Sequence, residues 1–224
     1  MKRAIAAGWA LAFVACGGAS ASDHSDDCTT VLAGTAIRDF TLMRVSGRDR
    51  VHFADCFAAT CIVEAYVVPG DLLVASPRPG DLVCTVFPNK RGGTKGWIPS
   101  GFLSPAPTES NPPLASWAGK WRLHKDAEIE IRVEGDQLVV KGQAFWMSGA
   151  PGVIHDGEIT GRNKPQGDIL AIPSPDAFDA LESADNPEYL CQATLRLVGP
   201  YLVVQDNGRC GGLNVTFTGV YRRP

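Results

Sequence analysis

The sequence has few of the residues on which enzymes commonly rely, and it lacks the short motifs that present them. Its four histidines, His24, His52, His124 and His155, fall in separate segments without metal-ligand spacing. It contains no GxSxG nucleophile elbow and no glycine-rich loop ending in GKS or GKT. We therefore predict a protein that is not an enzyme and that holds no cofactor and no metal.

Positive charge and long apolar runs are also scarce. The chain has 21 Lys and Arg against 24 Asp and Glu, which gives a formal net charge of −3 at pH 7. An acidic protein lacks the basic surface that nucleic-acid binding needs, so nucleic acid is not expected as a partner. No apolar run is long enough to predict a transmembrane helix.

The first residues have the parts of a secretory signal peptide. MKR is positively charged, AIAAGWALAFVAC is apolar, and ASA at Ala19–Ala21 is a cleavage site of small residues. Removal of residues 1–21 takes away two basic residues and no acid, so nineteen basic residues remain against 24 acidic ones, a net charge of −5. We predict an exported chain, periplasmic or secreted. The alternative is a lipoprotein, because FVAC resembles a bacterial lipobox that would place a lipid anchor on Cys16.

Six further cysteines indicate up to three disulfides in an oxidising compartment. Cys56 and Cys61 flank FAAT, a loop short enough to close locally. Cys28 would then tie the start of the chain to Cys84. Because the CxxC spacing of redox sites is absent, we predict structural disulfides rather than a redox or metal site.

Proline divides the chain into two halves. SPAPTESNPPLAS contains four prolines and no hydrophobic periodicity, which predicts a stiff, extended linker over residues 105–116. The predicted domains are therefore 22–104 and 117–224. The linker permits either docking or independence of the two.

Both halves have the pattern of short antiparallel strands, so we predict an all-β fold. In the first half, AYVV, DLLVAS, DLVCTVF and KGWIP are separated by glycine- and proline-containing turns. In the second, the pairs 127–133 with 138–146 and 194–198 with 201–205 form hairpins, and LNVTFTGVY (213–221) forms a further strand. The one helix candidate is PDAFDALES (175–183), inside a polar insertion.

Residues 66–105 are similar to bacterial SH3-like domains. The similarity lies in Gly70–Asp71 opening a strand, in GWIP at 96–99, and in SGFL as a closing turn and strand. It implies a small barrel of five or six strands and, as in many members, binding of cell-wall peptides or carbohydrates. Upstream, FTLMRVSGRDRVHFADCFAATC is longer than the usual first strands.

The second half opens with WAGKW and closes with YRR, which resembles lipocalin-like barrels. This resemblance implies that an arginine, Arg222, covers Trp121. The segment from Cys191 onward also resembles the end of exported bacterial proteins near the lysozyme-inhibitor group. We expect a small antiparallel β-barrel or sandwich here.

DNGRCGG, which begins at Asp206, is either a structural turn or a binding loop. A hairpin about Gly199–Pro200 pairs residues whose numbers sum to about 399, which brings Cys191 within reach of Cys210. This favours a turn held by a disulfide. In the alternative, Asp206, Asn207 and Asn214 lie in a loop whose backbone amides bind an anion.

Aromatic side chains are the better candidates for ligand binding, because they can stack on sugars; core packing is the alternative for each. The candidates are Trp97, Phe102, Trp117, Trp121, Phe145 and Trp146. Neighbours in one strand point to opposite faces, so Phe145 and Trp146 cannot both be buried in one core. A second candidate is the acidic part of the polar insertion, which is either a solvated loop, a calcium site or a plug for a basic enzyme cleft: Asp176, Asp179, Glu182, Asp185 and Glu188.

Together these patterns predict a non-enzymatic exported protein that binds a cell-wall component or an envelope protein, namely peptidoglycan or a protein acting on it. One alternative is an inhibitor of a lysozyme-type hydrolase, because a net charge of −5 suits a basic enzyme. The other is a lipocalin-like carrier of a small apolar ligand, which requires an apolar cavity.

Overall fold

The computed structural model describes residues 27–56, 61–77, 80–147, 152–172 and 190–224. The predicted signal peptide, Cys16, His24, the helix candidate at 175–183 and the acidic part of the insertion lie outside the described residues. The described part is an all-β protein with three antiparallel sheets.

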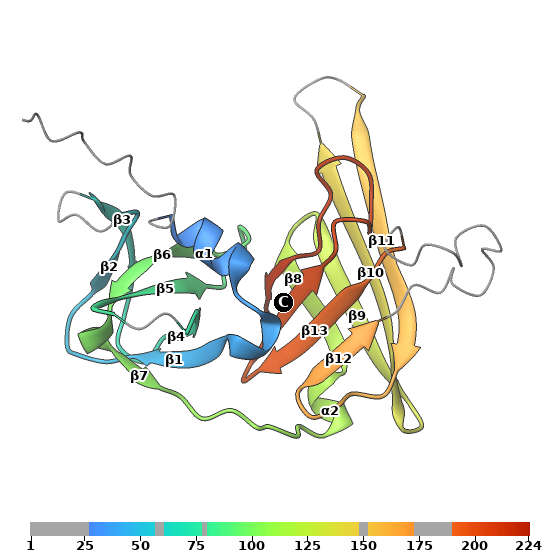
Figure 1. Cartoon of the computed structure of the whole chain (residues 1–224), viewed down its shortest axis with the longest axis horizontal. Helices are drawn as coiled ribbons and strands as arrows, with labels where there is room; N and C mark the ends of the chain where they lie inside the picture. Colours follow the sequence, from blue (N-terminus) through green and yellow to red (C-terminus); the bar gives the residue numbers. More distant parts are fainter. Residues whose placement is uncertain (1–26, 57–60, 78–79, 148–151, 173–189) are drawn as a thin grey trace, which may run out of the picture.

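The described residues of the first half form one seven-stranded sheet, shown in blue and green in Figure 1. Its strands are β1 (Thr41–Val45), β2 (Val51–Ala54), β3 (Ile62–Val67), β4 (Leu72–Ala75), β5 (Leu82–Phe87), β6 (Thr94–Pro99) and β7 (Leu103–Pro105). Their order in the sheet is β3-β2-β6-β5-β4-β1-β7. The 3-10 turn η4 (Ser100–Phe102) leads into β7, so the SGFL segment forms a turn followed by a short strand, as predicted.

A helix that the sequence analysis missed, α1 (Cys28–Gly34), precedes this sheet. The Asp27 carboxylate caps it by accepting the backbone N–H groups of Thr29 and Thr30, and these hydrogen bonds lower the pKa of Asp27. The Cys28–Cys84 disulfide fixes α1 against β5. Cys84 and Trp97 belong to one hydrophobic core cluster with Cys28 and Leu32 of α1, so the helix covers one side of the sheet.

The described residues of the second half form eight strands in two four-stranded sheets. The first sheet contains β8 (Gly119–His124), β9 (Ala127–Glu134), β10 (Gln137–Met147) and β11 (Ile154–Asn163). The second contains β12 (Ile169–Ile172), β13 (Ala193–Val198), β14 (Tyr201–Asp206) and β15 (Gly219–Tyr221). The sheets face each other, and an antiparallel bridge between Arg122 and Arg222 joins β8 to β15. The described strands do not close into a barrel.

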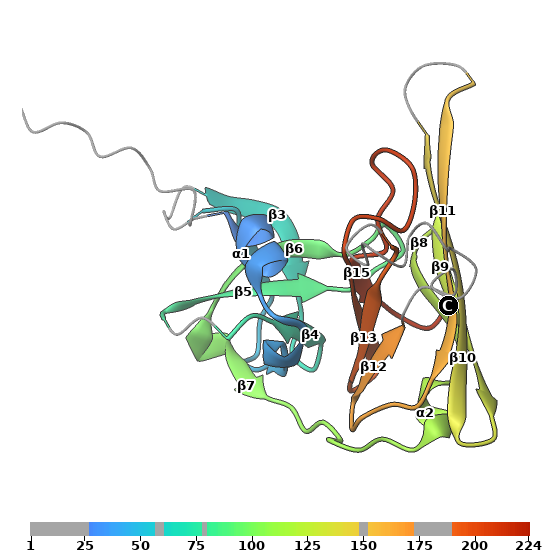
Figure 2. The same ribbon diagram turned by 45° about the vertical axis from the view of Figure 1, so that its right-hand side comes forward.

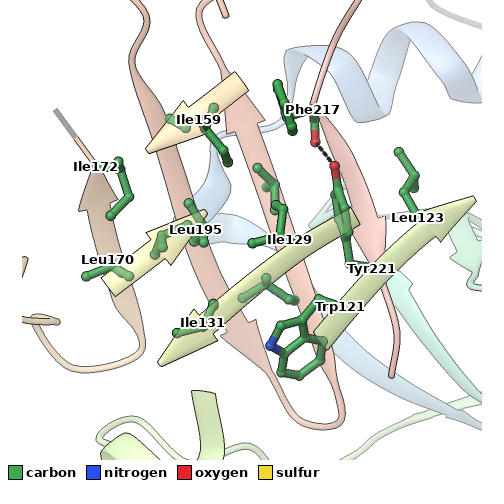
Figure 3. Packing of buried hydrophobic residues seen from close by; sticks show 14 of the residues in the cluster. Trp121, Leu123, Ile129, Ile131, Ile159, Leu170, Ile172, Leu195, Phe217 and Tyr221 are labelled. Carbon is green, nitrogen blue, oxygen red and sulfur yellow. Dashed lines mark hydrogen bonds between the residues drawn. The ribbon is translucent and has the colours of Figure 1, made fainter. Parts of the chain in front are cut away.

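Hydrophobic side chains from both sheets fill the space between them, as Figure 3 shows. Trp121 and Tyr221 are among the largest fully buried residues of this cluster. The Tyr221 hydroxyl donates to the carbonyl of Phe217 at 3.0 Å, and burial raises the pKa of Tyr221 far above its ordinary value. The apolar faces that the alternating pattern predicts are thus buried in this core.

The register of the β13–β14 hairpin is confirmed, because Ala193 pairs with Asp206 and Val198 with Tyr201. The single strand expected over 213–221 is wrong, since only Gly219–Tyr221 is a strand. Asn214 has a left-handed backbone with φ of 65°, which no regular strand allows.

The first half docks on the outer face of the β12–β15 sheet, which therefore lies between it and the β8–β11 sheet (Figures 1 and 2). Val198, Val203 and Val220 point out of the sandwich and join the hydrophobic cluster beneath α1. Because these contacts are apolar and buried, the halves joined by the proline-rich linker are not independent.

Arg196 of β13 forms hydrogen bonds across this interface. Its Nε donates to the carboxylate of Asp168 at 2.8 Å, and its Nη1 donates to the carbonyls of Ile37, Arg38 and Phe40 at 3.1, 2.7 and 2.8 Å. These carbonyls belong to η2 (Ile37–Asp39) and the residue after it. One guanidinium therefore bonds to both halves of the chain.

Candidate functional site

The glycine-rich loop after β14 is organised by Asp206. Its carboxylate accepts the backbone N–H groups of Gly208 at 2.7 Å and Thr218 at 3.1 Å and the hydroxyl of Thr216 at 2.9 Å. It also accepts the N–H of Phe217. These bonds replace the strand pairing expected for residues 213–218, and they leave the carboxylate engaged inside the loop.

Asn207 has a similar internal role. Its side-chain oxygen accepts the N–H groups of Gln192 and Arg209 at 3.1 and 3.2 Å, and its amide donates to the carbonyl of Leu190 at 2.7 Å. The Cys191–Cys210 disulfide closes the same loop. Asn214 is exposed in a turn. These hydrogen bonds and the disulfide thus fix the conformation of the loop.

The other two disulfides of the structure are Cys28–Cys84 and Cys56–Cys61. All three pairings are those indicated by the spacing of the cysteines. Three disulfides are typical of proteins from an oxidising compartment outside the cytoplasm. A carboxylate oxygen of Asp55 lies within 4.8 Å of the sulfurs of Cys56 and Cys61, but those sulfurs are bonded to each other and supply no thiolate for a metal ion.

The tryptophans proposed as sugar platforms are part of the core, which corrects that prediction for Trp97, Trp117 and Trp121. Trp97 lies in the cluster beneath α1, and the other two lie in the cluster between the two sheets. None of the three rings has a face free to stack on a ligand. Phe102 and Phe145 are exposed, and Trp146 is partly buried against the core.

A cation lies over Trp121, as the lipocalin-like resemblance implies, but it belongs to Arg223 and not to Arg222. The Arg223 guanidinium is 4.3 Å from the centre of the Trp121 ring and donates to the carbonyls of Ser116 and Ala118. Tyr221 is buried in the core, and side chains alternate along a strand. The residue two positions later, Arg223, is therefore the one on the side of Trp121.

The most distinctive exposed surface lies at the far end of the β10–β11 hairpin, which extends beyond the rest of the sandwich (Figure 1). Phe145 pairs with Asp156, and Met147 pairs with Ile154. Residues directly opposite each other share a face of the sheet, so Phe145, Met147 and Ile154 form one apolar surface. Their side chains are 45%, 54% and 62% exposed. We call these three residues the hairpin patch.

Acidic groups border the hairpin patch. Asp156 and, two residues later, Glu158 lie on the same face of β11, and both are exposed. Neither makes an ion pair with the residues that the structure describes; Glu158 accepts the Thr160 hydroxyl at 2.6 Å. On the opposite face of the same hairpin, the rings of Trp146 and His155 lie 5.6 Å apart. The surface is therefore apolar at its end and negatively charged beside it.

Of the residues at this surface, Phe145 was predicted from the sequence as a binding candidate, whereas Met147, Ile154 and Asp156 were not. The segment IHDGEITGRN has few apolar residues and two glycines, so it does not have the pattern of a core strand. One signal was present in β10: Phe145 and Met147 fall on the face that carries Lys141 and Gln143, where polar residues are expected.

No catalytic group comes together around the three described histidines. His52 lies 3.0 Å from the carbonyl of Val63, His124 accepts the N–H of Asp126, and His155 packs on Trp146. In the described chain, none of them is hydrogen-bonded to a serine, cysteine or carboxylate side chain, as a nucleophile and base would be. No described helix has the length and apolar character needed to cross a lipid bilayer.

Comparisons of the chain with protein-family models, with curated proteins and with solved structures find no match.

Proposed function

We propose that the chain is a non-enzymatic exported protein of the cell envelope, and that its hairpin patch binds a basic protein acting on peptidoglycan, such as a lysozyme-type hydrolase. The single observation that carries this proposal is the exposed apolar surface of Phe145, Met147 and Ile154 with Asp156 and Glu158 beside it. Clustered apolar side chains on a rigid element are typical of protein-binding sites.

The charges favour a basic partner. Two unpaired carboxylates lie at the border of the hairpin patch, and the exported chain has a predicted net charge of −5. Such an arrangement steers a positively charged protein toward the patch and raises the association rate, more strongly at low salt. Peptidoglycan hydrolases of the lysozyme type are a basic class that fits this requirement.

Direct binding of wall glycan is the second candidate, and the SH3-like resemblance of residues 66–105 favours it. The strand β6, the turn η4 and the short strand β7 are the segments on which this resemblance depends, although the described sheet is open and does not close into the small barrel that it implies. Phe102, at the end of η4, is the exposed aromatic of this half that was predicted to stack on sugars. The burial of Trp97 removes the larger platform, so we rank glycan second.

The structure gives less support to a lipocalin-like carrier. Such a carrier needs an apolar cavity inside the sandwich, but there the residues that would line it are packed against one another in a single core cluster. Trp117, Trp121 and Phe217 are fully buried in it.

The proposal is tested by measuring whether the chain from Ser22 inhibits lysis of purified cell-wall sacculi by a basic lysozyme. We expect inhibition that weakens as salt is raised, and we expect Phe145→Ser with Ile154→Ser to abolish it. The control is Val133→Ser, which changes a 41% exposed side chain at the other end of the sheet. Asp156→Asn should weaken inhibition with a reduced salt dependence.

Two results would contradict the proposal. Lysis at the uninhibited rate, with no binding of the lysozyme in a biosensor measurement, would exclude this partner class. Co-sedimentation of the chain with sacculi in the absence of any enzyme, lost in Phe102→Ser but kept in the hairpin variants, would identify glycan as the ligand instead.

A further inference from the structure

A cavity of about 410 Å³ lies between the two halves of the chain, away from the hairpin patch. Its volume falls within the range of small-molecule sites, roughly 300–1,000 Å³. The side walls come from α1, the turn between β5 and β6, β8 and the outer face of the β14–β15 pair. The cavity therefore exists only because the halves dock.

The floor of this interdomain cavity is apolar. From the first half it is lined by Leu32, Phe40 and Val86, and from the second by Leu123 and Val203. All five side chains are buried. Such a surface favours the hydrocarbon part of a ligand.

All the ionisable side chains that line the cavity are basic. Arg91, Lys95 and His124 line it, and no aspartate or glutamate does. Arg91 and Lys95 are exposed, and within the described residues neither side chain takes part in an ion pair or a hydrogen bond. Two cations without a counter-ion thus stand beside an apolar floor.

His124 completes this arrangement from the other half. Its Nδ1 accepts the backbone N–H of Asp126 at 3.2 Å, so the proton of the neutral ring lies on Nε2. The ring reaches across to the β5–β6 turn, where a Cβ on Gly92 would lie 3.5 Å from Cδ2 of His124. Cδ2 adjoins Nε2 in the ring, so the free donor is next to the turn that carries Arg91.

We infer that the interdomain cavity binds a small amphipathic organic anion. The apolar body of the ligand would lie against the buried residues of the floor, and its anionic group would be held by Arg91, Lys95 and the Nε2 proton of His124. A neutral molecule of the same shape would gain only the apolar contacts, and a cationic one would be repelled. This site does not depend on the proposed partner of the hairpin patch.

The test compares three linear probes of ten carbons each, decanoate, decan-1-ol and decylammonium, by calorimetric titration of the chain from Ser22. We expect decanoate to bind at least about tenfold more tightly than decan-1-ol, because charge-assisted contacts are added. Decylammonium should not bind. In amide NMR spectra, decanoate should shift the signals of Gly92, Gly93, Gln205 and Gly219, which line the cavity.

The variant Arg91→Gln with Lys95→Gln should lose this preference for decanoate and keep the affinity for decan-1-ol. Lys90→Gln is the matched control, since Lys90 is an exposed cation in the same turn but does not line the cavity. Both replaced side chains are exposed, so the fold should be retained. Equal affinity for the anion and the cation, unchanged decanoate binding in the double variant, or NMR shifts confined to other regions would overturn the inference.

Discussion

Arg196 should be the single most important polar residue for the union of the two halves. Its side chain is 14% exposed and that of its partner Asp168 is 18% exposed, so most of the pair is shielded from solvent. Replacing Arg196 with methionine keeps much of the apolar stem but leaves Asp168 and three carbonyls of residues 37–40 without their donor.

The magnitude follows from the burial of the pair. Removing one partner of a buried ion pair costs about 3–5 kcal/mol, and the small residual exposure places Arg196→Met near the lower end, about 3 kcal/mol. In a chain of this length, 1 kcal/mol corresponds to roughly 2–4 °C, so the melting temperature should fall by about 6–12 °C.

The assay is thermal unfolding of the chain from Ser22, combined with hydrogen exchange of the backbone. Exchange should accelerate in η2 and in β13, which Arg196 connects. Arg132→Met is the control, because Arg132 pairs with Glu130 at 67% exposure and should contribute less than about 1 kcal/mol. If Arg196→Met were no more damaging than this control, the interface would be held by its apolar contacts alone and our reasoning about Arg196 would be refuted.

Three other predictions concern the second half. Asp206→Asn should destabilise the chain by about 2 kcal/mol, since the carboxylate accepts several hydrogen bonds, and fast amide exchange confined to the loop after β14 is the measurement. The hydrogen bond from Arg122 lowers the pKa of Glu128, so its stabilising effect is present above the unfolded-state pKa and is lost as the pH falls through the lower folded-state value. The difference in melting temperature between the wild type and Glu128→Gln should therefore be largest at neutral pH and vanish in acid; a constant difference would contradict this. Arg223→Ala should lower the free energy of unfolding by about 1 kcal/mol and change Trp fluorescence, whereas Arg222→Ala should have a smaller effect on both. The reverse order would indicate that Arg222 covers Trp121, as the lipocalin-like resemblance implies.

The strands with strict alternation could be predicted from the sequence, because each has one face in a core. The helix α1 could not, since seven residues containing two threonines have little intrinsic helical preference, and its stability comes from the Asp27 cap and the disulfide to Cys84. The strand β11 was missed for a different reason. Gly157 is required there because a side chain would collide with the carbonyl of Cys210, and glycine weakens the pattern of a strand.

The candidate sites were harder to predict than the fold. The hairpin patch depends on the register between β10 and β11, which decides that Met147 and Ile154 share a face. The interdomain cavity depends on how the halves dock, which brings Lys95 and His124 to one cavity from different sheets. Local sequence patterns contain neither kind of information.

The position of the β12–β15 sheet between two layers bears on the ancestry of the chain. A domain that is exchanged between genes must have a polar surface when it stands alone. Here, separation of the two halves would expose Val198, Val203 and Val220 to solvent. We therefore expect the two halves to be inherited together. A free-standing relative of the second half should have polar residues at these three positions, so they are a simple marker for distinguishing single-module from two-module chains in genome sequences.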